Sequence, residues 1–169
     1  EGAAQGDCRA PSPVTPLMVL KGHTDDLTGA VFCGNDKRVV TASHDDTLRL
    51  WDLTRLAEPR VLARQGSAAL DVEYNWNGEL IAAAFEANPA LVVDGDGGVR
   101  KRLGYAGSVD FIPAERAQQD GDYVLTISRE TPTSRNWSLV HEWPVAGGSP
   151  ATLASGGPFQ SAVYGPHGD

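Results

Sequence analysis

Val40-Thr-Ala-Ser-His-Asp-Asp-Thr-Leu-Arg-Leu-Trp-Asp52 consists of two short β-like runs joined by a polar turn, and Gly22-His23 stands before a third run at residues 27–32. Each run has the length of a short strand, and turn-forming residues separate the runs. Residues 39–43 scarcely alternate between apolar and polar side chains, which is expected where both faces of a strand are covered. We therefore expect a small sheet that is packed between neighbouring sheets.

The order of short strands recurs along the chain. Asp94 follows Asp52 by about 42 residues, which is the period of a repeat of four short strands. Later copies of the strands are expected at residues 70–74, 79–85, 90–94, 100–104, 108–112, 123–128, 138–143 and 151–154. Residues 159–164 would begin a fourth copy, residues 17–20 would be the outer strand of a preceding sheet, and the polar insert 113–122 would be a surface loop. No segment has clear 3.6-residue apolar periodicity, so the chain is predicted to be all-β.

The succession of Gly-His, Ser-x-Asp and Trp-Asp within one such unit resembles the repeat of the WD40 β-propeller family. The resemblance implies a partial β-propeller of about three to four four-stranded antiparallel blades. The expected organisation is a linker at 1–13 and a partial propeller at 14–169, with repeats at about 21–63, 64–105 and 106–155 and the start of a fourth at 156–169. A closed ring in this family usually has about seven blades, so the rest of the propeller or a second copy of the chain would be needed to close it.

Ser43, His23 and Asp45 are a possible hydrolase triad, because such a set can generate a nucleophile. Ser43 is not surrounded by the Gly-x-Ser-x-Gly turn that exposes a nucleophilic serine. Ser43 is also expected inside a strand. Both observations favour a structural role. The WD40 resemblance implies that His23 bonds Asp45 and Ser43, and that Ser43 accepts the indole N–H of Trp51. A buried tryptophan needs such an acceptor. We therefore predict a structural tetrad of His23, Ser43, Asp45 and Trp51, and no catalytic residue.

A partner-facing surface is the other candidate site. In WD40 propellers, partners commonly bind the face that carries the loop before the first strand and the turn between the second and third strands. The positions that match this face are Asp26, Thr28, His44, Ala69, Asp71, Phe85 and Arg129. Phe85, beside acidic neighbours, would anchor a basic or apolar peptide. The alternative is that all of these are ordinary solvated loop residues.

The chain is acidic, with 14 Lys and Arg against 22 Asp and Glu and a net charge of −8. A nucleic-acid partner is not expected, because sequence-independent binding relies on basic side chains that neutralise phosphates. No run approaches the about 18 apolar residues that suggest a membrane span, so no membrane partner is expected. Cys8 and Cys33 do not form a disulfide framework, which favours a buried free thiol at Cys33 and a cytoplasmic location.

No motif in the sequence indicates a metal or a cofactor. Asp94-Gly-Asp-Gly-Gly98 resembles the start of an EF-hand loop, but the positions that require Gly and Glu hold Val99 and Tyr105. A tight turn between strands is expected there instead. His141-Glu142 lacks the second histidine of a zinc-protease motif, and there is no Walker-type glycine loop.

The function predicted from these patterns is that of a non-catalytic scaffold for a protein or peptide partner, within a larger multidomain protein. One alternative is the regulatory or sensing arm of a bacterial multidomain kinase, protease-like or NTPase protein. A second alternative is an enzyme built on a propeller, for which Asp71 and Asp110, at comparable strand starts, are the candidate groups.

Overall fold

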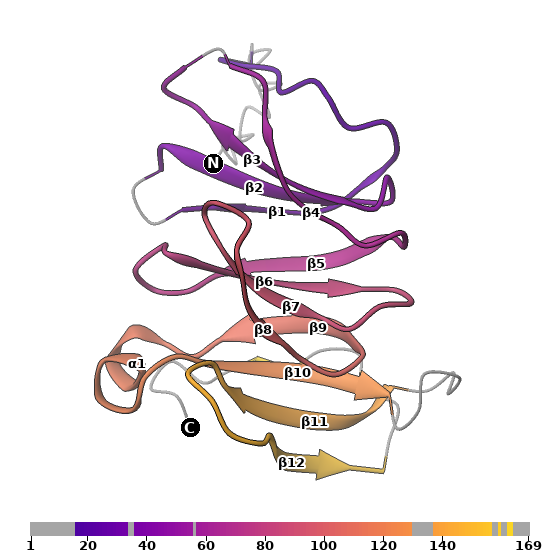
Figure 1. Cartoon of the computed structure of the whole chain (residues 1–169), viewed down its shortest axis with the longest axis vertical. Helices are drawn as coiled ribbons and strands as arrows, with labels where there is room; N and C mark the ends of the chain where they lie inside the picture. The colour runs from indigo at the N-terminus through magenta and orange to yellow at the C-terminus, as the bar shows by residue number, and fades with distance from the viewer. Residues whose placement is uncertain are drawn as a thin grey trace, which may run out of the picture.

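The computed structural model describes residues 16–33, 36–55, 57–129, 137–156, 159 and 162–163. The predicted linker at 1–13 lies outside these residues, as does most of the predicted start of a fourth repeat at 156–169. The described residues contain three four-stranded antiparallel sheets and one short helix, which confirms the predicted fold class (Figure 1).

Each sheet is built from four strands that follow one another in the chain. The first sheet contains β1 (Leu27–Phe32), β2 (Arg38–Ser43), β3 (Thr47–Asp52) and β4 (Arg60–Arg64). The second sheet contains β5 (Ala69–Tyr74), β6 (Leu80–Phe85), β7 (Leu91–Asp94) and β8 (Val99–Arg102). The third sheet contains β9 (Ala106–Phe111), β10 (Tyr123–Arg129), β11 (Trp137–Pro144) and β12 (Ala151–Ser155). Successive antiparallel pairing of this kind needs only short turns.

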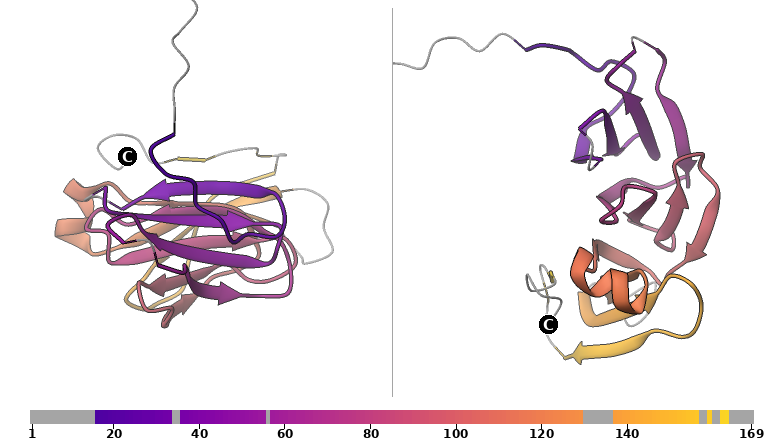
Figure 2. Two further views of the ribbon diagram at one scale, coloured as in Figure 1. Left: turned by 90° about the horizontal axis from the view of Figure 1, so that it is seen from above. Right: turned by 90° about the vertical axis from the view of Figure 1, so that its left-hand side faces the viewer.

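The three sheets stack face to face along an arc (Figure 2). The first strands of the sheets run next to one another, since β5 packs against both β1 and β9. Gly29 on β1 makes this approach close, because an added Cβ would lie 3.4 Å from a side-chain carbon of Val72 on β5. The last strand of each sheet is the edge strand farthest from its first strand. This is the arrangement of blades in a propeller.

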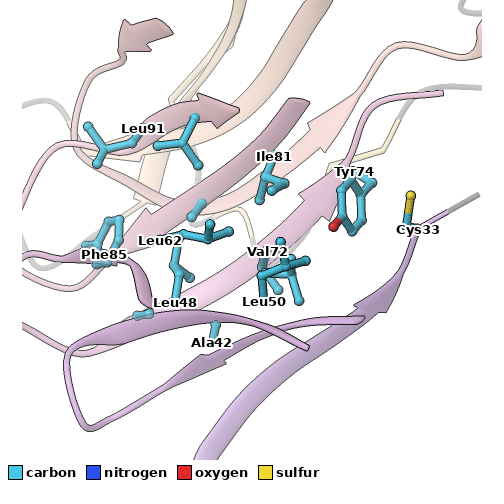
Figure 3. Close-up of a cluster of buried hydrophobic side chains, with 14 residues drawn as sticks. Cys33, Ala42, Leu48, Leu50, Leu62, Val72, Tyr74, Ile81, Phe85 and Leu91 are labelled. Carbon is cyan, nitrogen blue, oxygen red and sulfur yellow. The ribbon is translucent and has the colours of Figure 1, made fainter. Parts of the chain in front are cut away.

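Two apolar layers hold the stack together. The layer between the first two sheets is drawn in Figure 3 and includes Leu48, Val72, Ile81 and Phe85, all of them buried. The layer between the second and third sheets is formed largely by small residues of β6 and β7 against Val109, Phe111 and Val124 of the third sheet. The middle sheet is therefore covered on both faces, which explains why its β6 strand is apolar without alternation.

Cys33 follows β1 and is buried with a free thiol, as predicted. Its sulfur lies 3.7 Å from the carbonyl oxygen of Gly78, which joins the β1–β2 connection to the β5–β6 turn of the next sheet.

The structure contradicts two of the expected elements. Residues 114–120 of the polar insert form a helix, α1 (Ala114–Asp120), and not a loop without secondary structure. The helix has only seven residues and buries Ala117 alone, so no apolar periodicity could reveal it. Residues 17–20 form no strand, because within the described residues no neighbouring sheet offers them a hydrogen-bonding edge.

The described part of the chain contains no helix that is long and apolar enough to cross a membrane.

The turn at residues 94–98 is tight, as expected from its sequence. The Asp94 carboxylate accepts the backbone N–H groups of Asp96 and Gly98 at 3.0 and 2.8 Å. Gly97 has a φ of 86°, and a Cβ added there would lie 2.8 Å from the carbonyl oxygen of Leu62 on β4. The turn of the second sheet thus rests directly on the backbone of the first.

Replacing Gly97 with alanine should weaken the contact between the first two sheets. The matched control is Gly66→Ala, since Gly66 has a φ of 71° but open space around its Cβ position. We expect Gly66→Ala to lower the free energy of unfolding by about 1–2 kcal/mol, the usual cost of a left-handed residue with a side chain. Gly97→Ala should cost clearly more, because backbone must also move. Urea titration followed by circular dichroism measures both, and equal losses would show that the close approach is unimportant.

Candidate functional site

The polar centre of the first sheet is a set of hydrogen bonds around Asp45. Its carboxylate accepts a hydrogen bond from the His23 ring at 2.9 Å and from the Thr24 N–H at 3.2 Å. On the other side it accepts the Thr47 N–H at 3.1 Å and the Thr47 hydroxyl at 2.5 Å. Asp45 therefore ties the loop that precedes β1 to the turn between β2 and β3.

Hydrogen-bond donors determine the charge state of the Asp45 carboxylate. Burial would raise the pKa of Asp45, since a charged group loses its hydration there, but hydrogen bonds from Thr47, His23 and the Thr24 N–H outweigh burial. The net effect holds the pKa of Asp45 well below its usual range. The Arg49 guanidinium, 3.6 Å away, adds a favourable charge. Asp45 is thus a charged acceptor and not a proton donor near neutral pH.

Thr41, and not Ser43, connects His23 to Trp51. The Trp51 indole N–H donates to the Thr41 hydroxyl oxygen at 2.8 Å, and the second ring nitrogen of His23 lies 2.6 Å from the same oxygen. The prediction that Ser43 accepts from Trp51 is therefore wrong. Cross-strand register is the reason, because Trp51 pairs with Val39 and has Thr41 as its diagonal neighbour on the same face.

Ser43 has a different role at the end of β2. Its hydroxyl donates to the carbonyl oxygen of Asp25 at 3.2 Å and accepts the Asp45 N–H at 3.1 Å. The His44 N–H donates to the Asp26 carbonyl oxygen at 2.9 Å, so the same loop and turn are joined twice. Ser43 is 0% exposed and lacks a hydrogen bond to His23, which removes the geometry that a nucleophile requires.

The other two sheets each keep only part of this hydrogen-bond network. In the second sheet the Asn88 amide donates to the Gln65 carbonyl oxygen at 2.9 Å and to the Ser67 hydroxyl at 2.8 Å, joining the β6–β7 turn to the loop before β5. In the third sheet the Trp143 indole donates to Thr126 at 3.0 Å. The sequence interpretation missed Thr41, Asn88 and Thr126. Strand alternation places each threonine on the same face as the serine two residues later but does not choose between them, and nothing short of the loop geometry identifies Asn88.

A histidine extends the network of the third sheet. His141 lies 3.1 Å from the Ser128 hydroxyl, which is itself 3.0 Å from the hydroxyl of Thr126. Burial lowers the pKa of His141, because desolvation disfavours the imidazolium ion. Ser128 is buried, so this serine–histidine pair stabilises the sheet and does not face a substrate.

Some of the predicted partner-facing residues do lie at one end of the stack. Asp26 and His44 are exposed on the two loops that Asp45 joins. Thr28 is half-buried, and its hydroxyl donates to the carbonyl oxygen of Ala69 at 2.6 Å, across the boundary between the first two sheets. Whether this surface receives a partner stays a prediction.

The structure contradicts the surface placement of Ala69 and Phe85. Both are 0% exposed and belong to the apolar layer between the first two sheets. They face each other as a cross-strand pair at the ends of β5 and β6, where the first sheet covers them. Phe85 therefore does not anchor a peptide. The side chain of Arg129 lies outside the described residues.

Asp71 also serves the packing of the sheets. Its carboxylate accepts its neighbour Val72 N–H at 2.9 Å and the Val109 N–H of the third sheet at 3.0 Å. Burial raises the pKa of Asp71 despite these two bonds. Within the described ranges, no group of three or more His, Cys, Asp or Glu side chains has the arrangement of a metal site.

Comparison with known proteins is consistent with this architecture. Residues 14–52 match the family model described as "WD domain, G-beta repeat". The chain is similar to the DENN domain and WD repeat-containing protein SCD1 of Arabidopsis thaliana, with 31% identity over 151 residues. It is similar to WD repeat-containing protein 37 of Xenopus tropicalis, with 33% identity over 91 residues, and to ribosome biogenesis protein YTM1 of Meyerozyma guilliermondii, with 27% identity over 133 residues.

The alignments cover most of this chain but little of the relatives. They include 89%, 54% and 73% of the chain in these three cases. The chain spans only 12%, 18% and 28% of the relatives' own lengths.

Thr41→Val should destabilise the protein, because it removes the acceptor of the Trp51 indole while keeping the shape of the side chain. The expected loss is about 1–3 kcal/mol in the free energy of unfolding, the cost of a buried donor without a partner. Thr41→Ser retains the hydroxyl and should stay close to the wild type. Urea unfolding followed by tryptophan fluorescence gives both values. Equal stability of the valine and serine variants would contradict the role assigned to Thr41.

Proposed function

The chain belongs to the WD40-repeat family, and we propose that it acts as a non-catalytic scaffold that presents the loops at one end of its sheets to a protein or peptide partner. Repeats of this kind generally mediate contacts between proteins and form extended binding surfaces. His23, Ser43 and Asp45, which resemble a catalytic triad in the sequence, form hydrogen bonds that join loops to strands.

The observation that carries this proposal is the way in which Asp26 and His44 are held. Both side chains are exposed, yet their loops are joined by the Asp45 carboxylate and by the bond from the His44 N–H to Asp26. A loop that is already ordered loses little conformational freedom on binding, which favours affinity. Asp25 and Asp26 are both exposed beside His44, so a partner segment with basic groups would fit this end best.

We further propose that the chain is one segment of a larger multidomain protein. The printed name of the Arabidopsis relative includes a DENN domain besides its WD repeats, and this chain matches only part of that protein. The interpretation as a bacterial regulatory arm stays a prediction that these relatives do not test.

The face of the first sheet that points away from the second sheet supports the proposal that further sheets belong to this protein. In the third sheet, Trp143 packs into the apolar layer against the second sheet. Trp51 has the same place in the first sheet, but its face borders an open pocket of about 620 Å³ lined also by Leu27 and Phe32. These two side chains are 59% and 60% exposed. Within the family, another four-stranded sheet from the same protein or a second copy would cover this face.

Photocrosslinking tests the partner-facing loops. A benzophenone amino acid placed at residue 26 or 44 should give a discrete adduct with a partner protein in an extract of the source cells. The matched control is residue 58, since Glu58 is also exposed but belongs to the β3–β4 connection at the other end of β3. Adducts of equal yield at residues 44 and 58, or none at residues 26 and 44, would refute this surface.

Size-exclusion chromatography with light scattering tests the uncovered face. The purified chain should self-associate or bind the dye anilinonaphthalene sulfonate, because exposed apolar surface drives both. Leu27→Ser and Phe32→Ser should reduce association and dye binding, whereas Val61→Ser, at a residue that is 45% exposed on β4, should not. A monomer at high concentration that binds no dye would contradict the proposal.

A further inference from the structure

Trp76 is a large aromatic side chain on the surface, 45% exposed at the β5–β6 turn. This turn is at the opposite end of β5 from Ala69, and hence away from the loops that carry Asp26 and His44. It lies on the same side of the stack as α1 (Figure 1). Tryptophan is among the side chains most enriched as anchors in interfaces.

The turn that carries Trp76 is held rigidly by Asn75. The buried Asn75 side chain accepts the N–H groups of Glu79 and Leu80 at 3.0 and 2.9 Å. Its backbone N–H donates to the Leu80 carbonyl oxygen at 3.0 Å, and its carbonyl accepts the Gly78 N–H at 3.0 Å. Trp76 is therefore presented on an ordered turn, which lowers the entropic cost of binding to it.

Acidic groups surround the turn. The Asn75 amide lies 3.3 Å from both carboxylate oxygens of Asp122, which belongs to the segment after α1. Glu79 is exposed within the turn itself and accepts from the Asn77 amide at 3.1 Å. Asp36 is exposed on the neighbouring β1–β2 connection, and its N–H donates to the Cys33 carbonyl oxygen. The Cys33 sulfur in turn contacts the carbonyl oxygen of Gly78 in the turn that carries Trp76.

The cations at this end do not neutralise these three carboxylates. Within the described residues, Asp36, Glu79 and Asp122 have no ion pair within 4.0 Å. Arg116 is engaged by Asp120 at 3.5 Å and by Glu142 at 3.0 Å, and it lies over the ring of Tyr123. Lys37 and Arg38 are also basic, and the Arg38 guanidinium lies 3.7 Å from the Cys33 sulfur. With Arg116, these three basic residues stand against Asp36, Glu79, Asp120, Asp122 and Glu142, so the balance around Trp76 is still negative.

We propose that Trp76, Glu79, Asp122 and Asp36 form a second docking surface, which binds an arginine-bearing segment of a partner protein. A guanidinium group stacks flat on the face of an indole and at the same time donates in a fork to carboxylates, and this surface offers both. A compact ammonium group gains less from the stacking face. The acidic character of the whole chain would also speed the approach of a basic segment.

Fluorescence anisotropy with a labelled peptide tests this surface on the full chain. The probe contains three arginines separated by Gly-Ser spacers, and two matched peptides carry citrulline or lysine in place of arginine. We expect the arginine peptide to bind, with an affinity that falls as salt is added, and the uncharged citrulline peptide to bind at least fivefold more weakly. Trp76→Ala should weaken the arginine peptide about fivefold to tenfold, and Trp76→Phe should give an intermediate value. Asp122→Asn and Glu79→Gln should each weaken it by a smaller factor.

Val61→Ala is the control, because Val61 is also 45% exposed but lies on β4. Circular dichroism confirms that each variant is folded before binding is measured. The proposal is overturned if the arginine peptide does not bind, if Trp76→Ala binds as tightly as Val61→Ala, or if citrulline replaces arginine without loss. Equal binding of the lysine peptide would overturn the choice of a guanidinium partner. Crosslinking from residues 26 and 44 is a separate measurement, so failure here and failure of the first surface are distinguishable.

Discussion

Burial of both faces of each four-stranded sheet is the constraint on which this structure depends. A sheet that is apolar on both sides is stable only when neighbours cover it. The second sheet meets this requirement twice, with Phe85 turned toward the first sheet and Ala82 and Ala84 toward the third. Gly104 leaves room for the Trp143 ring, because a Cβ added there would lie 3.2 Å from it. The other face of the first sheet is covered less completely: Trp51 is buried there, but Leu27 and Phe32 stay exposed beside an open pocket.

Hydrogen bonds between loops and strands are the second feature that the three sheets share, although different residues make them. Asp45 joins loop to turn in the first sheet, and Asn88 does so in the second. A charged carboxylate with several donors is a stronger link than a neutral amide. In the third sheet, Thr126 satisfies the indole N–H of Trp143 without a histidine–aspartate pair. The first and third sheets both keep the hydrogen bond from tryptophan to threonine, although the residues around it differ. The buried indole N–H is therefore paired in both sheets.

The two ends of the stack differ in what they offer to a partner. At one end, the exposed side chains of Asp26 and His44 are carried on loops that a buried carboxylate orders. At the other end, Trp76 projects from a turn that is ordered by Asn75 and bordered by Asp122. Both proposed docking surfaces carry exposed acidic side chains on hydrogen-bonded loops, which would favour basic segments at low entropic cost.

Strand spacing, turn residues and the period of about 42 residues are local properties, and the sequence alone was enough to predict from them the all-β class, the order of strands and the free buried Cys33. Contacts across strands and sheets required the tertiary structure. Residues two apart on a strand share a face, so only the register shows that Thr41 and not Ser43 meets Trp51. Phe85 was predicted on the surface because its position matches the partner-facing side of WD40 propellers, but the adjoining sheet buries it. Such contacts depend on how strands and sheets pair in space, and no local pattern encodes them.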